Sequence, residues 1–236
     1  MFENPYPSRR PLRAALFDVD GTLVDTNDLH TLAWREAFLH FGHDFASATI
    51  REQVGKGGDN LIPTLLPDLP EDEGAEIDEW RGALFKRDYL PRAVPFPEVR
   101  ALFERLVEDG VRIVLASSSS KKEVDYHLGL IGCADLVFAV TTRDDVESSK
   151  PCPDIFAAAL GKVAPLGPDE AIVIGDTPWD VKAAARAGLR TIAFLSGGFT
   201  ERQLRDAGAA FVYQGASDLL ARYDHSPFGA AAHAEA

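Results

Sequence analysis

Short, almost continuous apolar stretches recur along the chain and mark its expected strands. Strands that are buried on both faces, as in a parallel sheet, have this character, and their short length distinguishes them from helices. The stretches run from Ala14 to Phe17, Val111 to Ala116, Leu136 to Val140, Ala171 to Ile174 and Thr191 to Leu195. We therefore expect a largely buried parallel sheet.

Helical patterns lie between these stretches. Apolar residues recur at three-four spacing from Val99 to Val107 and again from Ile155 to Val163. Alternating strands and helices predict an α/β fold, with a doubly wound, Rossmann-like parallel sheet and helices on both faces. In such a fold the ligand site lies beyond the carboxyl ends of the strands.

The segment 25–92 breaks this alternation, because it has helical patterns and no convincing strand. Leu29, Ala33, Ala37 and Phe41 share one helix face, and Ile77, Trp80, Leu84 and Phe85 share another. We expect an inserted all-helical domain at 25–92 and a discontinuous α/β core at 1–24 and 93–225. Both chain ends are expected outside the core, with a flexible, alanine-rich tail at 226–236.

Composition narrows the classes of function. A net charge of −13 would repel nucleic acid, and no apolar run approaches the ~20 residues of a membrane-spanning helix. The start of the chain has no secretory signal, so a cytoplasmic protein is expected.

Cys133 and Cys152 are too few for a disulfide framework or a zinc site. Nothing specifies an oligomeric state, and a monomer is favoured.

Two carboxylates follow the first expected strand, at Asp18 and Asp20. Gly21 permits a sharp turn there, and like charges this close are costly unless they share a cation or a proton. A polar turn without chemistry is the alternative, because short Asp/Gly clusters are common in loops.

The fourth expected strand also ends in acidic residues. Thr177 and Asp180 form a helix start with Pro178 between them, which explains Asp180 but leaves Asp176 unexplained. If the first and fourth strands are neighbours, Asp18, Asp20 and Asp176 converge as oxygen ligands for a cation such as Mg²⁺.

Two further groups suit phosphate. Ser117 ends the second strand, and its hydroxyl, with the backbone N–H groups of the turn at Ser118, can bind phosphate oxygens. Lys150 is flanked by prolines that fix the base of its side chain. A single lysine is usually a solvated surface residue, but this one can neutralise a phosphoryl group if the fold brings it beside the acidic residues.

Together these segments resemble the four motifs of the haloacid dehalogenase superfamily. They are DVDGTL at 18–23, the Ser117 turn, KPCPD from Lys150, and GDTPWD at 175–180. The motifs occur in the family's order, and the resemblance covers about residues 13 to 200. It implies a Mg²⁺-dependent phosphatase that hydrolyses a small phosphorylated metabolite through an aspartyl-phosphate.

The resemblance also implies roles for individual residues. Asp18 is the nucleophile, Asp20 is the general acid and base, and Thr22 holds the loop. Ser117, Ser118 and Lys150 bind the phosphoryl group. The metal ligands are Asp18, the Asp20 backbone carbonyl and Asp176, with Asp180 orienting them.

The inserted helices resemble the cap of this superfamily. The stretch 25–34, which includes His30, is similar to the hinge and first cap helix of the β-phosphoglucomutase and phosphoglycolate phosphatase subgroup. His30 and Lys56, the latter in a glycine-rich loop, are therefore substrate-binding candidates, although an ordinary helix residue and a surface turn are the alternatives. The mutases typically carry an arginine in this loop, and its absence favours hydrolysis.

Three alternatives remain open at this stage. A phosphomutase would use the same core and return the phosphoryl group to the sugar. A dehalogenase would need neither Asp20 nor magnesium, and a non-catalytic receiver-like module would lack the cap and the second carboxylate of the first motif. The sequence does not specify the substrate.

Overall fold

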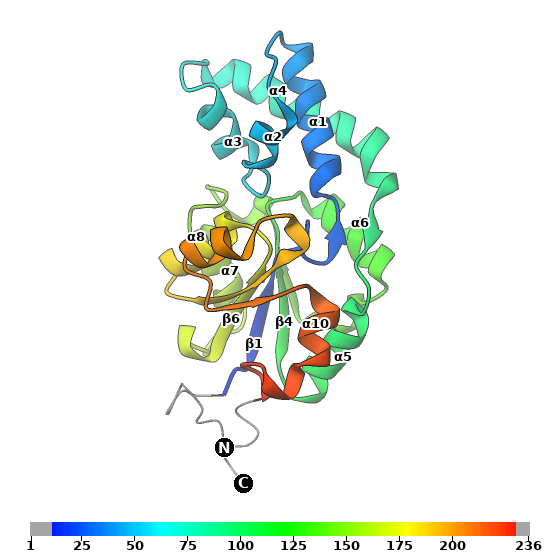
Figure 1. Cartoon of the computed structure of the whole chain (residues 1–236), viewed down its shortest axis with the longest axis vertical. Coiled ribbons are helices and arrows are strands. Elements are labelled where there is room, and N and C mark those ends of the chain that lie inside the picture. Colours follow the sequence, from blue (N-terminus) through cyan, green and yellow to red (C-terminus); the bar gives the residue numbers. More distant parts are fainter. Residues whose placement is uncertain (1–10, 230–236) are drawn as a thin grey trace.

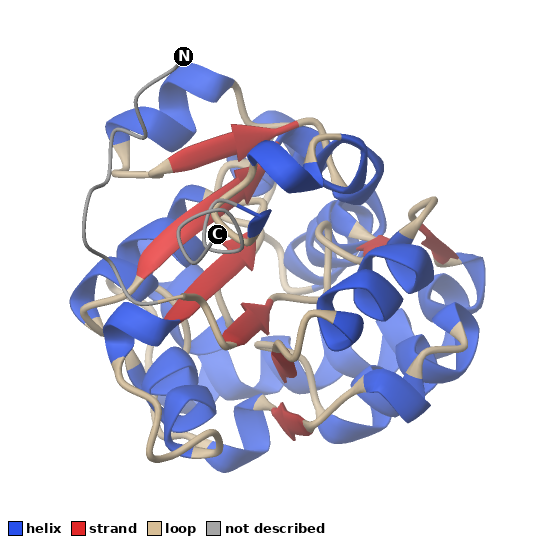
Figure 2. Ribbon diagram, turned by 90° about the horizontal axis from the view of Figure 1, so that it is seen from below, coloured by secondary structure: helices blue, strands red, loops and turns tan. Residues whose placement is uncertain are grey.

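A six-stranded parallel sheet forms the centre of the protein in a computed structural model that describes residues 11–229 (Figures 1 and 2). The strand order is β5-β4-β1-β6-β7-β8. The strands are β1 (Ala14–Phe17), β4 (Arg112–Ala116), β5 (Ala139–Thr141), β6 (Ala171–Gly175), β7 (Arg190–Phe194) and β8 (Phe211–Tyr213). The predicted doubly wound α/β fold is confirmed.

Alternate residues of β1 enter different halves of the core. Ala15 and Phe17 pack with α5 (Val99–Glu108), α6 (Lys121–Ile131) and α10 (Ala216–Ala221) on one face of the sheet. Ala14 and Leu16 pack with α7 (Asp154–Gly161) and α8 (Pro178–Arg186) on the other. Both faces are thus buried, which explains the continuous apolar runs. Each fully buried large apolar side chain contributes about 1.5–3 kcal/mol.

The register places the ends of three strands side by side. Phe17, the last residue of β1, pairs with Leu115 of β4 and with Ile174 of β6. The first and fourth expected strands are therefore neighbours, as the metal-site prediction required. The residues that follow Phe17 and Ile174 emerge at the same edge of the sheet, below the helices α1–α4 (Figure 1).

The segment between β2 (Val24–Asp25) and β3 (Val94–Pro95) is mainly helical, and these two strands pair as a short antiparallel ribbon. They are α1 (Asn27–His40), α2 (Ser47–Arg51), α3 (Gly58–Leu65), α4 (Glu71–Leu84), the π-helix η1 (Phe85–Tyr89) and the 3-10 turn η2 (Leu90–Arg92). Their own apolar cluster includes Trp34, Phe38, Leu61 and Ile77. The predicted helical insertion is present, while the exact division at 25 and 92 stays a prediction.

Two strands of the six-stranded sheet differ from expectation, and the short strands β2 and β3 were not expected either. The run from Leu136 to Val140 begins in a 3-10 turn, η3 (Ala134–Leu136), so β5 starts only at Ala139. β8 was not predicted, because its three residues are too short for a clear apolar run. The remaining elements are α9 (Glu201–Asp206) and the 3-10 turns η4 (Arg143–Asp145), η5 (Pro168–Glu170), η6 (Leu195–Gly197) and η7 (Tyr223–His225).

The end of the described chain is packed rather than free. Ser226 and Phe228 are buried, and the Phe228 ring stacks on Tyr223 with ring centroids 6.0 Å apart. The expected tail at 226–236 is therefore wrong for 226–229, because its one aromatic residue fills the core, and 230–236 lie outside the described residues. Leu12 likewise belongs to the core. Among residues 11–229, no helix is long and apolar enough to cross a membrane.

Candidate active site

Asp18 and Lys150 form a buried ion pair where β1 ends. The Lys150 ammonium contacts Oδ1 of Asp18 and lies 2.7 Å from Oδ1 of Asp180. Burial disfavours the charged form of Lys150, but Asp18 and Asp180 outweigh this effect and raise its pKa above the usual value. The two carboxylates therefore favour the charged form of Lys150, whose side chain is only 1% exposed.

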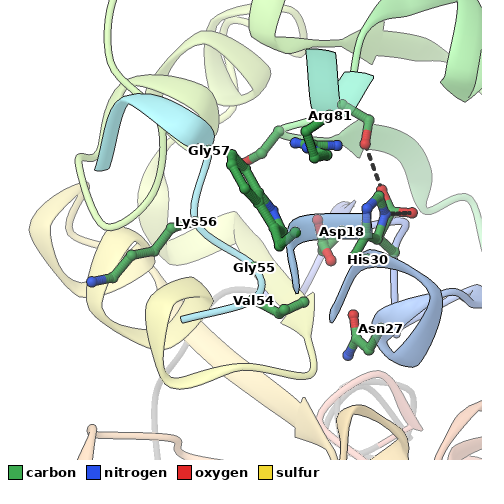
Figure 3. Close-up of a pocket in the computed structure, with 12 residues that line it drawn as sticks. Asp18, Asn27, His30, Val54, Gly55, Lys56, Gly57 and Arg81 are labelled. Carbon is green, nitrogen blue, oxygen red and sulfur yellow. Dashed lines mark hydrogen bonds and ion pairs between the residues drawn. The ribbon is translucent and has the colours of Figure 1, made fainter. Parts of the chain in front are cut away.

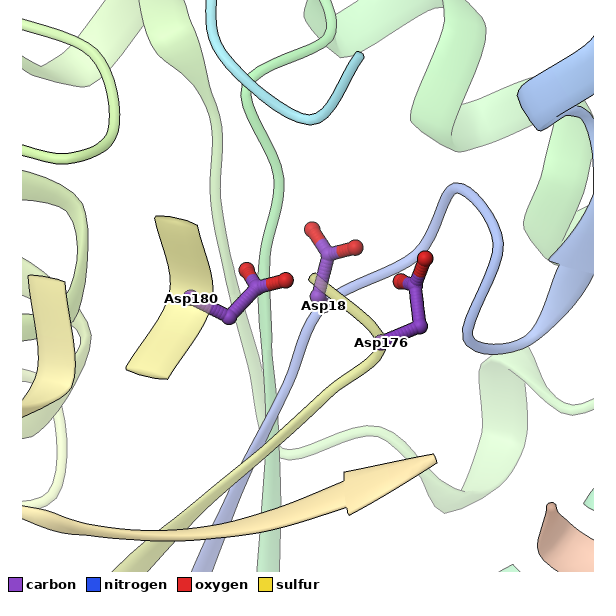
Figure 4. A group of neighbouring side chains, drawn as sticks. All are labelled: Asp18, Asp176 and Asp180. Carbon is purple, nitrogen blue, oxygen red and sulfur yellow. The ribbon is translucent and has the colours of Figure 1, made fainter. Parts of the chain in front are cut away.

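Asp18, Asp176 and Asp180 together form what we call the carboxylate cluster (Figure 4). One oxygen atom from each residue lies within 4.8 Å of the other two. Burial raises the pKa of Asp176 to about 7, with added repulsion from Asp180. Burial also raises the pKa of Asp18 well above its usual range, against the attraction of Lys150. Such a cluster of buried oxygen donors suits a hard divalent cation.

The Asp176 carboxylate is held by two hydrogen bonds. Thr22 Oγ1 donates to Oδ1 at 2.6 Å, and Asn27 Nδ2 donates to Oδ2 at 2.7 Å. Gly21, with a φ of 76°, allows this arrangement, because a Cβ atom there would overlap both Asn27 and Asp176. Thr22 thus connects the loop after β1 to Asp176, and Asn27 is a second support of this carboxylate that the sequence did not indicate.

Asp180 caps α8 and also belongs to the carboxylate cluster. Its Oδ2 accepts hydrogen bonds from the backbone N–H of Thr177 at 3.0 Å and from the Thr177 hydroxyl at 2.6 Å. The predicted cap of α8 is therefore confirmed. Its other oxygen, Oδ1, faces Lys150. One side chain therefore both caps α8 and belongs to the carboxylate cluster.

Asp20 lies among histidines and hydroxyl groups rather than in the carboxylate cluster. His30 Nε2 is 3.0 Å and His127 Nε2 is 3.5 Å from its Oδ1, while Ser119 Oγ donates to its Oδ2 at 2.8 Å. Burial opposes ionisation of Asp20, but His30 and then His127 outweigh it and hold the pKa of Asp20 well below its usual range. The expected convergence of the Asp20 side chain on the metal is therefore not seen.

The two serines expected to bind phosphate after β4 have different environments. Ser117 Oγ accepts a hydrogen bond from the backbone N–H of Ser119 at 3.0 Å, and Ser117 is fully buried. Ser118 Oγ is buried, has no hydrogen-bond partner in the described part of the chain, and borders a cavity above Asp18. Ser118 is therefore the serine best placed to donate to a ligand.

That cavity has a volume of about 40 Å³ and lies between the sheet edge and the inserted helices (Figure 3). A buried water needs ~10–15 Å³, so the cavity has room for only a few water molecules. Its lining consists of Asp18, Asp20, Asn27, His30, Trp34, Val54, Gly55, Lys56, Gly57, Arg81, Ser118 and Ser119.

His30 and Lys56, the two substrate-binding candidates of the inserted helices, are oriented differently in this cavity. His30 stacks on Phe85, with ring centroids 4.0 Å apart, and its Nε2 reaches Asp20. The Lys56 ammonium instead donates to Gln53 and Thr64, and Figure 3 shows its side chain directed away from Asp18. Lys56 therefore borders the cavity without presenting its charge to it.

Arg81 brings a cation into the cavity that sequence reasoning missed. It lies on α4, where the chain is rich in acidic residues, and its side chain is only 10% exposed. Figure 3 shows its guanidinium across the cavity from Asp18. The glycine-rich loop has no arginine, but α4 supplies one to the same space.

Comparison with known proteins agrees with this geometry. The sequence profile of the haloacid dehalogenase-like hydrolases matches residues 12–188. A phosphoglycolate phosphatase from Aquifex aeolicus is 29% identical over 195 residues, covering 79% of this chain and 86% of that protein. One from Yersinia pseudotuberculosis is 30% identical over 193 residues, covering 80% and 83%.

Solved structures have the same fold. A hydrolase from Pseudomonas syringae superposes with a TM-score of 0.84 at 29% identity, covering 90% of this chain and 98% of that one. The prediction of a phosphatase with this fold is confirmed, and the chain belongs to the haloacid dehalogenase-like hydrolase family.

Proposed function

We propose that this protein is a Mg²⁺-dependent phosphatase that hydrolyses a small phosphomonoester through an aspartyl-phosphate on Asp18. The observation that carries the proposal is the position of Asp18. It borders the cavity, contacts the buried cation Lys150, and belongs to the carboxylate cluster.

The carboxylate cluster fits a magnesium ion. Asp18 and Asp176, both with raised pKa values, would hold the ion, while Asp180 shares its charge with Lys150. Near the ion both carboxylates would be ionised, which a nucleophilic Asp18 requires. When bound, Mg²⁺ supplies positive charge to the phosphoryl oxygens as they gain charge in the transition state.

In the first step an Asp18 oxygen attacks phosphorus, so that a new P–O bond forms as the ester P–O bond breaks. The leaving oxygen takes a proton from the carboxyl group of Asp20. Lys150 and the Ser118 hydroxyl stabilise the charge on the transferring oxygens, an effect worth about 3 kcal/mol per donor. In the second step water attacks phosphorus, its proton passes to Asp20, and Asp18 leaves with phosphate released.

The two histidines at Asp20 suit these proton transfers. The histidines hold the pKa of Asp20 low, which favours the ionised carboxylate that accepts a proton from water in the second step. The proton that Asp20 gives to the leaving oxygen in the first step enters with the substrate, as the proton of a phosphate monoanion, and the proton taken from water in the second step leaves with the phosphate product.

The test combines catalysis with trapping of the intermediate. With Mg²⁺ and a panel of metabolite phosphates, the wild type should release phosphate, and acid quenching followed by mass spectrometry should find a phosphorylated Asp18 peptide. Asp18→Asn should lose turnover and remain folded, whereas Asp72→Asn, an exposed control on α4, should keep it. Activity in Asp18→Asn would refute the proposal, and an isomerised ester in place of free phosphate would favour the mutase alternative.

A further inference from the structure

Lys56 and Trp179 have no part in the proposed reaction, and they contact each other where the inserted helices meet the core. The Lys56 ammonium lies 4.0 Å from the centre of the Trp179 ring. The indole Nε1 of Trp179 donates a hydrogen bond to the Glu52 carbonyl over 3.2 Å. Trp179 lies on α8, whereas Glu52 and Lys56 lie between α2 and α3, so both contacts join the two parts of the protein.

The residues that Trp179 contacts belong to one side of the cavity. We call residues 52–57, which connect α2 to α3, the wall loop, and its residues 54–57 border the cavity. Gly55 brings this loop close to the turn between β6 and α8. Its φ is 100°, and a Cβ atom there would lie only 2.7 Å from Cγ2 of Thr177. The wall loop therefore packs on the turn that carries Asp176 and Asp180.

The Lys56 side chain is held in the direction of Trp179 by two further contacts. Its ammonium donates to Oε1 of Gln53 at 2.8 Å and to Oγ1 of Thr64 at 3.0 Å. Burial lowers the pKa of Lys56, and repulsion from Lys182 adds to this effect. The negative face of an indole ring attracts a cation and so favours the charged lysine. Lys56 thus directs its charge to the core and away from Asp18 (Figure 3).

Other contacts hold the chain on either side of the wall loop. Before it, Arg51 Nη2 donates to the Gly197 carbonyl at 2.5 Å. After it, Asn60 Nδ2 donates to the Ser149 carbonyl at 3.0 Å. Loss of Trp179 should therefore loosen the loop between these two points without releasing the inserted helices from the core.

We propose that Trp179 is a positioning residue, which holds the wall loop against α8 so that the loop closes the cavity over Asp18. Lys56 is its partner in the loop and does not bind the substrate. When the loop moves away, the cavity loses one side, so the substrate binds more weakly. The expected effect on turnover rests on the proposed function, whereas the expected effect on the loop does not.

Hydrogen exchange with mass spectrometry tests the effect on the loop without any substrate. The backbone N–H groups of Gln53, Val54 and Lys56 donate to backbone carbonyls, so their exchange reports opening of the wall loop. Trp179→Ala should speed this exchange by about tenfold. Trp179→Phe keeps an aromatic ring but loses the N–H donor, and should have a smaller effect. Exchange in β1 and β6 should match the wild type, which shows that the core is folded.

A double-mutant cycle tests whether Lys56 acts through Trp179. Lys56→Met should lower kcat/KM for phosphate esters by about 3- to 10-fold, mainly through KM, and Lys56→Arg should restore it. In the Trp179→Ala protein, Lys56→Met should have little further effect. Lys182→Met is the matched control, because Lys182 also lies over the Trp179 ring, at 4.6 Å, but is exposed and on the same helix. It should change neither loop exchange nor KM.

The outcomes separate the two proposals. If no phosphate ester is hydrolysed, the proposed function fails, and the exchange measurement still tests Trp179. Loop exchange at the wild-type rate in Trp179→Ala would refute the positioning role. If Lys56→Met costs the same factor in kcat/KM with and without Trp179, Lys56 acts on the substrate directly and its assignment to Trp179 is wrong.

Discussion

The side chain of Asn27 donates a hydrogen bond to the carboxylate of Asp176 over 2.7 Å. Asn27 is the first residue of α1, and Asp176 directly follows β6. The inserted helices are therefore attached to the carboxylate cluster at the point where they begin. The position of α1 and the geometry of the proposed metal ligands depend on one another.

Loss of this hydrogen bond should weaken metal binding. Groups that orient a ligand typically change metal affinity by about 10- to 100-fold. We expect Asn27→Ala to raise the Mg²⁺ concentration needed for half-maximal activity by about tenfold, measured by titration at saturating substrate. Asn60→Ala is the control, because Asn60 binds the Ser149 carbonyl instead. Equal titration curves for Asn27→Ala and wild type would contradict this role.

Replacing Lys150 should affect both rate and stability. Lys150→Met leaves Asp18 and Asp180 buried without their cation, and removal of one partner of a buried ion pair costs about 3–5 kcal/mol. Urea unfolding without metal should show this loss, and kcat should fall by about 10²- to 10³-fold. Lys122→Met, at an exposed position, should change neither quantity. An unchanged free energy of unfolding would show that the pair is not buried in solution.

Stability without metal should fall as the pH rises. The pKa of Asp176 is raised to about 7, so the folded protein binds this proton more tightly than the unfolded chain, whose carboxyl group has a pKa of ~3.9. Stability from this group is therefore present at low pH and is lost between about pH 4 and pH 7. In chelator, the melting temperature should decrease over this range.

Mg²⁺ should reverse this trend, because it binds the ionised carboxylates. The increase in melting temperature on adding Mg²⁺ should be larger near pH 8 than near pH 5. Asp176→Asn cannot titrate and should flatten both dependences. A wild-type melting temperature that rises with pH in chelator, with the same slope in Asp176→Asn, would rule out this titration.

His127 should control the pH dependence of turnover through Asp20. Its Nε2 lies 3.5 Å from Asp20, and both histidines lower the pKa of that carboxyl group. His127→Phe should therefore raise the pKa of Asp20 and move the acidic limb of the kcat profile to higher pH. The exposed His40 provides the control His40→Gln. Identical pH profiles for His127→Phe and wild type would exclude the effect.

The strands and helices of the core were predictable because the signals for them lie in adjacent residues of the sequence. Five apolar runs predicted five of the six strands, and Thr177 with Asp180 predicted the start of α8, because strand burial and helix capping each depend on a few adjacent residues. The position of Asp18 and Asp176 beside each other also followed, because parallel strands end at one edge. The irregular start of β5 and the short β8 lack such signals.

The environment of the site residues was less predictable, because it depends on which side chains face one another across the fold. Asn27, His127 and Arg81 lie on helices whose sequence gives no indication of a distant partner. Arg81 in particular follows an acidic stretch that is typical of a solvated helix face. The resemblance implied both Ser117 and Ser118 as phosphate ligands, but only the fold distinguishes the hydrogen-bonded Ser117 from Ser118, whose hydroxyl is unpartnered among the described residues and which borders the cavity.

The β2–β3 ribbon gives the chain a single place of exit and return, since Val24 pairs with Pro95 and Asp25 with Val94. The chain segment that covers the cavity from above lies between these two residue pairs in the sequence. A transplanted segment from a relative needs to match this narrow junction and to keep the hydrogen bond from Asn27 to Asp176, while Asp18, Lys150 and Asp176 themselves are not exchanged. Selectivity for a new ester can thus be acquired by exchanging one contiguous stretch of the gene.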